Sequence, residues 1–139
     1  MNLKALCFTT MMASAALAQP LYSEQNNSLT FKNKRGSLLE LTIQSDNQIS
    51  GYFTTAVASK SCPDAVGTKR PVTGYIVGNA LTFSVVYPMC QSVLSISGNF
   101  TKNQNNIDTI SILTHQAVDI THEGPGARFI GHDTYRKVS

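Results

Sequence analysis

Residues 72–101, with the sequence VTGYIVGNALTFSVVYPMCQSVLSISGNFT, decide the fold. They contain three runs of β-branched and aromatic residues: Val72–Val77, Leu81–Tyr87 and Val93–Thr101. The turn residues Gly78-Asn79 and Pro88–Gln91 separate these runs. Short runs of this kind with turn residues between neighbours are typical of an antiparallel meander.

The same pattern continues on both sides of this stretch, and no apolar period of 3.6 residues runs long enough for a helix. Eight strands are therefore predicted: Leu29–Lys32, Ser37–Gln44, Ile49–Ser59, Val72–Val77, Leu81–Tyr87, Val93–Thr101, Ile107–Leu113 and Arg128–Val138. An eight-stranded meander tends to close because closure removes unpaired edges. The predicted fold is an all-β, up-and-down barrel.

Alternation along a strand predicts which side chains share a face. The predicted inward sets are Ser37, Leu39, Leu41 and Ile43; Phe53, Thr55, Val57 and Ser59; Leu81, Phe83, Val85 and Tyr87; Ser92, Leu94 and Ile96; Ile107, Thr109, Ser111 and Leu113; and Phe129, Gly131, Asp133 and Tyr135. Small polar residues occur near the strand ends of these sets. They indicate either a lined cup for one small ligand or a rim that bonds only to water.

The N-terminus predicts a secretory signal peptide at residues 1–18, because Lys4 precedes an uncharged apolar run that ends in Ala16-Leu17-Ala18. A buried N-terminal helix is the alternative interpretation. We expect a flexible leader at 19–28, a barrel domain at 29–139, and an extracellular or periplasmic location. No later segment has the apolar length of a membrane-spanning helix, so no membrane partner is predicted.

Cys7 would leave with the signal peptide, and Cys62 and Cys90 would remain. An even number of cysteines in a secreted domain favours a disulfide between them, with two unrelated thiols as the alternative. Net charge is +3 without an aromatic-interleaved basic patch, which argues against a nucleic-acid partner.

Catalytic and metal chemistry find little support in the sequence. His132 and Asp133 are neighbours, so on a strand they face opposite ways and cannot form a relay with each other. The other histidines, His115 and His122, complete no metal-ligand spacing with His132. The sequence therefore predicts no enzyme, no metal site and no cofactor.

Five segments, in order, resemble the avidin and streptavidin family over about residues 29–138: Asn33–Ser37 (NKRGS), Gly51–Val57 (GYFTTAV), Leu81–Tyr87 (LTFSVVY), Ile96–Gly98 (ISG) and Gly131–Val138 (GHDTYRKV). The resemblance implies an eight-stranded barrel that binds biotin as a ligand. The placement of Cys62 and Cys90 is similar to the dimeric, rhizavidin-like branch and implies a disulfide between two loops at the cup mouth. Closing these loops would reduce the ordering cost of binding.

The resemblance also implies a role for each matching residue. Asn33 and Ser37 match donors to the ureido oxygen of biotin, and Thr55 and Asp133 match partners of its two N–H groups. Ser59 and Ser92 match positions near the valerate carboxylate. The complete set of predicted biotin-binding residues is Asn33, Ser37, Phe53, Thr55, Ser59, Tyr87, Ser92, Leu94, Ile96, Ser111, Leu113 and Asp133.

The chain departs from the family pattern in the walls of the cup, because it contains no tryptophan. Tyr87, Ile96 and Ser111 stand at wall positions, Leu94 where a hydroxyl faces the biotin sulfur, and Phe53 where a tyrosine hydroxyl joins the ureido-oxygen cluster. We therefore expect reduced affinity for biotin; the alternative is a barrel that binds another small molecule or has a structural or defensive role.

A second copy of this chain is the other predicted partner. The cysteine placement favours a homodimer, with a homotetramer as the alternative. The predicted contact is made through outward apolar residues such as Ile110 and Ile112.

Overall fold

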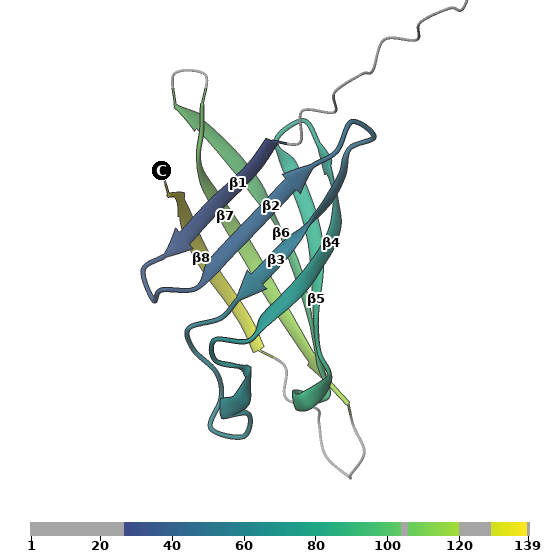
Figure 1. The fold of residues 1–139 in the computed structure, drawn as a ribbon, viewed down its shortest axis with the longest axis vertical. Helices are drawn as coiled ribbons and strands as arrows, with labels where there is room; N and C mark the ends of the chain where they lie inside the picture. The colour runs from purple at the N-terminus through teal and green to yellow at the C-terminus, as the bar shows by residue number, and fades with distance from the viewer. Residues whose placement is uncertain (1–26, 104–105, 120–128, 139) are drawn as a thin grey trace, which may run out of the picture.

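The structure, a computed structural model, describes residues 27–103, 106–119 and 129–138. In these ranges, eight antiparallel strands pair in sequence order and close into a barrel, which confirms the predicted fold (Figure 1). The strands are β1 (Asn27–Asn33), β2 (Leu38–Ile43), β3 (Gln48–Thr54), β4 (Lys69–Val77), β5 (Ala80–Tyr87), β6 (Ser92–Asn103), β7 (Asn106–Val118) and β8 (Phe129–Lys137). Two short 3-10 helices, η1 (Pro63–Ala65) and η2 (Pro88–Cys90), follow β3 and β5.

The predicted signal peptide at 1–18 and His122 lie outside the described residues. The expected leader at 19–28 is outside them up to residue 26, and β1 begins at Asn27, two residues before the predicted strand. No helix in the described ranges is long and apolar enough to cross a membrane.

The barrel closes where the first strand meets the last. β1 pairs with β8 through Phe31–Lys137, Lys32–Arg136 and Asn33–Tyr135. Antiparallel pairs directly opposite each other bring their side chains together on one face. The closure therefore brings the inward side chains near the end of β1 against those of β8.

The inward faces predicted for β2, β5 and β6 are confirmed, and their apolar side chains form the core beyond the open end. Fully or almost fully buried members are Phe31, Leu39, Leu41, Val72, Val85, Ile96 and Ile110. At about 25 cal/mol per Å² of buried apolar surface, this core is the main stabilising contribution. It fixes the strands whose ends carry the polar residues.

The predicted face of β7 is wrong. Ile110 and Ile112, expected outside as a dimer contact, are buried inside the barrel, whereas Leu113 is 52% exposed on the outer face. The reason is a β-bulge: Thr101 pairs with Thr109 and Lys102 with Ile107, which leaves Asp108 as an extra residue. An extra residue reverses the alternation beyond it, so counting from Ile107 assigned every later side chain to the wrong face.

β3 is shorter than predicted, and β7 is longer. β3 ends at Thr54. The hydroxyl of the next residue, Thr55, bonds to both the carbonyl and the N–H of Val57, so these backbone groups are not paired with a neighbouring strand. β7 continues to Val118, five residues beyond the predicted end at Leu113. The segment 114–118 is too polar to be predicted as a strand that faces the core. Its inward residues, Thr114 and Gln116, line the open cup instead.

Candidate ligand-binding cup

A cavity of about 580 Å³ opens at the end of the barrel where β1 ends and β2 begins. Nine of the twelve predicted site residues line it: Asn33, Ser37, Phe53, Thr55, Ser59, Tyr87, Ser92, Leu94 and Asp133. The sequence prediction missed other residues of the lining, among them Arg35, Ile112, Thr114, Gln116, Phe129 and Tyr135. The structure thus gathers most of the predicted set around one opening.

Three predicted site residues do not line the cavity. Ile96 faces inward but is 1% exposed within the core beyond the cup. Ser111 and Leu113 lie on the outer face as a result of the bulge in β7, and the Ser111 hydroxyl is 3.0 Å from His132 Nε2 on the neighbouring strand. Ile112 takes the inward position that was assigned to Ser111.

The tight turn between β1 and β2 positions Asn33 and Ser37. The backbones of these two residues bond to each other at 3.1 Å, and Gly36 occupies the turn at φ 97°, a conformation that favours glycine. The Ser37 N–H donates to Asn33 Oδ1 at 2.8 Å, which directs Asn33 Nδ2 towards β8. The Ser37 hydroxyl accepts the N–H of Ala56 at 3.0 Å.

Asp133 on β8 accepts a hydrogen bond from the side-chain amide of Asn33, at the end of the neighbouring strand β1. Asn33 Nδ2 donates to Asp133 Oδ2 at 2.7 Å, and the guanidinium of Arg35 lies 3.6 Å from the same oxygen. Asp133 Oδ1 accepts the N–H of Thr134 at 2.8 Å. A carboxylate has about four acceptor sites, so Asp133 retains capacity for one more N–H from the cup.

Thr55 lines the cup just past the end of β3. Its hydroxyl donates to the carbonyl of Val57 at 2.6 Å and accepts the N–H of Val57 at 3.3 Å. Because its only proton is used, the free capacity of Thr55 Oγ1 is that of an acceptor. Thr55 therefore suits an N–H group of a ligand.

Two hydroxyls on the β5–β6 side of the cup have no partner in the described part of the chain. They belong to Tyr87 and Ser92, which are opposite each other in the register and are each 4% exposed. Burial raises the pKa of Tyr87 to about 12, although the nearby charge of Arg70 lowers it. Both hydroxyls are neutral at physiological pH.

Comparison with known proteins identifies the family. The model of the avidin family matches residues 22–138. The chain belongs to the avidin family. A search of curated protein sequences gives no match.

Three solved avidin-like structures resemble this family member. The rhizavidin–biotin complex has 24% identity and a TM-score of 0.68 over 82% of this chain and 94% of that one. The short afifavidin–biotin complex has 26% identity and a TM-score of 0.67, with coverage of 80% and 88%. Core-bradavidin has 27% identity and a TM-score of 0.66, with coverage of 81% and 100%. Avidins are binding proteins rather than enzymes, which confirms the prediction of a non-enzyme.

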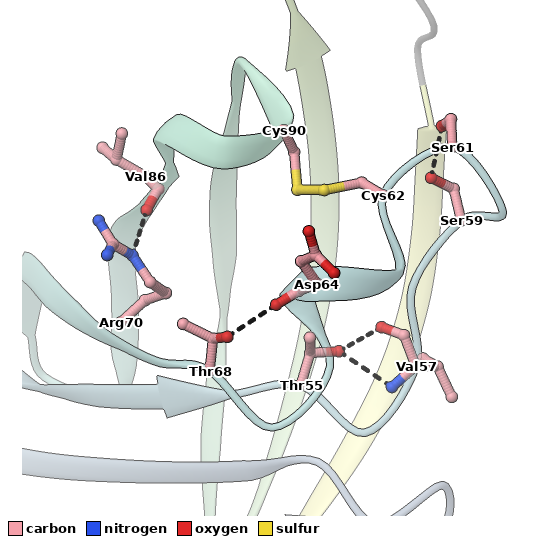
Figure 2. Close-up of a disulfide and its surroundings, with 10 residues drawn as sticks. All are labelled: Thr55, Val57, Ser59, Ser61, Cys62, Asp64, Thr68, Arg70, Val86 and Cys90. Atoms are coloured by element: carbon pink, nitrogen blue, oxygen red, sulfur yellow. Dashed lines mark hydrogen bonds between the residues drawn. A yellow bond between two sulfur atoms is a disulfide. The ribbon is translucent and has the colours of Figure 1, made fainter.

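A disulfide ties the mouth of this avidin barrel. Cys62 and Cys90 are bonded with their Cα atoms 5.6 Å apart, as predicted (Figure 2). The bond joins the segment before η1 to the end of η2, and both cysteines contact the cup. Two loops that follow different strands are thereby held at one side of the opening.

Proposed function

We propose that this avidin-family protein binds biotin in the cup, with the cyclic urea at the Asn33–Asp133 end. The observation that carries this proposal is the complementary set of polar groups at that end. Ser37 offers a rotatable hydroxyl, whereas Thr55 and Asp133 offer acceptors. A cyclic urea presents one acceptor oxygen and two N–H donors, which is the matching pattern.

The energetics favour this end of the cup as the anchor. A hydrogen bond from a ligand N–H to a carboxylate contributes about 1.5–3 kcal/mol. Donors that converge on the urea oxygen stabilise the charge that develops there, as they do in an oxyanion hole. Because the Asn33–Ser37 turn already fixes these groups, little ordering is needed when a ligand enters.

The affinity is proposed to be lower than that of the tight family members. The chain has no tryptophan, and Leu94 and Ile112 contribute aliphatic surface to the cup. An aromatic side chain buries about 150–250 Å², and each wall lost to a small residue costs several kcal/mol at about 25 cal/mol per Å². Phe53 in place of a tyrosine removes one more hydrogen bond. In total, we expect the binding free energy to be weaker by about 6–10 kcal/mol than that of biotin–streptavidin, which leaves nanomolar to micromolar binding.

Titration calorimetry of the oxidised protein with biotin tests the function. We expect saturable heat with one site per chain and a dissociation constant between nanomolar and micromolar. No heat, together with no shift of the melting temperature at millimolar biotin, would reject biotin as the ligand. A shift with another small molecule would then support the alternative ligand, since native-state ligands raise the melting temperature.

A secreted homodimer is proposed as the form that functions. The outer face of β6, β7 and β8 supports self-association, because Val93 and Ala117 are paired there and Leu113 and Ile130 are 52% and 68% exposed. These residues replace Ile110 and Ile112 as the proposed contact. The disulfide supports export after cleavage near Ala18 to an oxidising extracellular or periplasmic space.

Native mass spectrometry of exported protein tests both parts of this proposal. We expect twice the mass of a chain that begins near Gln19, and we expect Ile130→Glu to yield single chains because it places a charge in the contact. Val77→Glu is the matched control, since Val77 is 78% exposed on β4. A wild-type mass of one chain would contradict the dimer, and a retained N-terminus would contradict cleavage.

A further inference from the structure

Tyr135 lies at the polar end of the cup. Alternation predicts it on the inward face of β8, but the predicted set of biotin-binding residues does not include it. It is directly opposite Asn33 in the pairing of β1 with β8 and is 3% exposed. Its ring packs against Phe53, with a centroid distance of 6.5 Å and a tilt of 59°. The paired strands β1 and β8 and the ring of Phe53 on β3 therefore fix the direction of its hydroxyl.

The hydroxyl oxygen of Tyr135 already accepts hydrogen bonds. Asn33 Nδ2 donates to it at 3.3 Å. Burial, with a smaller contribution from the charge of Asp133, raises the pKa of Tyr135 well above its ordinary value, although the charge of Arg35 and a hydrogen bond from the Ser37 hydroxyl lower it. Tyr135 therefore keeps its proton at neutral pH.

The Ser37 hydroxyl, the other polar group beside it among the described residues, donates to Tyr135 and accepts the N–H of Ala56 at 3.0 Å, so the Tyr135 proton is the one that this cluster leaves unused. A buried donor without an acceptor costs free energy, so such groups usually have a partner. Asn33 differs, because its two amide protons are directed to Asp133 at 2.7 Å and Tyr135 at 3.3 Å. Tyr135, rather than Asn33, retains the free donor.

We propose that the Tyr135 hydroxyl donates to the carbonyl oxygen of the bound cyclic urea beside Ser37, and that Asn33 positions this hydroxyl. This inference rests on the proposed biotin function and assigns a donor to it. Tyr135 then polarises the urea carbonyl, while Ser37 and Asn33 donate to the Tyr135 oxygen and Asn33 links Tyr135 to Asp133. The hydroxyl of Tyr135 would thereby replace the tyrosine hydroxyl that Phe53 lacks.

The test is Tyr135→Phe, which keeps the ring and removes the hydroxyl alone. We expect biotin affinity to fall about tenfold, as the loss of one hydrogen bond from a buried hydroxyl predicts. Infrared spectra of biotin labelled with ¹³C at the urea carbon provide a second readout. At saturating biotin, the carbonyl stretch of the variant complex should lie at a higher frequency than in the wild type, because one donor is gone.

Tyr75→Phe is the control, since Tyr75 is 61% exposed on the outside of β4. Its affinity and carbonyl frequency should equal those of the wild type. If wild type binds biotin and Tyr135→Phe changes neither readout, the assignment of Tyr135 is wrong while the proposed function stands. If wild type itself binds no biotin, both are overturned.

Discussion

Asp133→Ala is expected to weaken biotin binding by about 30- to 150-fold, equivalent to about 2–3 kcal/mol. The substitution removes the charged acceptor of one ligand N–H and leaves that donor without its partner. It also frees Asn33 Nδ2, which Asp133 holds at 2.7 Å. Titration calorimetry of the variant against wild type measures this loss.

Two further variants sharpen that experiment. Asp133→Asn keeps an acceptor oxygen without the charge, so its affinity should lie between those of wild type and the alanine variant. Asp46→Ala removes an exposed carboxylate whose bond is to Gln48 in the turn at the other end of β2 and β3, and it should bind like wild type. Equal affinity for Asp133→Ala and Asp46→Ala, with both folded, would remove Asp133 from the site.

Replacing both Cys62 and Cys90 by serine is expected to lower the free energy of unfolding by about 3–4 kcal/mol. The bond closes a loop with a sequence separation of 28, and the cost follows from the larger freedom of the uncrosslinked unfolded chain. For a domain of this size, the melting temperature should fall by roughly 10–15 °C. We also expect weaker biotin binding, because two mouth loops would need ordering on binding.

Reductant provides the control for the disulfide prediction. Wild type treated with dithiothreitol should melt like the double variant, whereas the double variant should not respond to dithiothreitol. Chemical denaturation measures the free energies. A difference below about 1 kcal/mol would mean that other contacts hold the mouth, such as the bond from Gly67 N–H to the Thr55 carbonyl at 2.9 Å.

Most of the barrel could be predicted because its strands alternate cleanly. Leu81, Phe83, Val85 and Tyr87 are all buried, as the period of two requires, and Ser92 follows the same rule on the next strand. A polar residue that is an even number of positions from these buried residues on the same strand must also point into the barrel. This is why nine of the twelve predicted site residues line one cavity.

The errors arise where the alternation is interrupted or where burial depends on a distant segment. The extra residue Asp108 has no distinctive sequence signal, yet it moved Ser111 and Leu113 to the outside. Tyr135 was on the correct face, but only the pairing with β1 shows that its hydroxyl meets Asn33. The alternation of residues within one strand cannot reveal a contact between residues more than a hundred positions apart.

The join between β1 and β8 has a consequence for how the protein matures. Asn33 and Ser37 belong to the first hairpin, whereas Asp133 and Tyr135 belong to the last strand. The recognition site is therefore incomplete until β8 has paired with β1. A ligand that contacts both strands would stabilise the closed barrel against separation of β8 from β1.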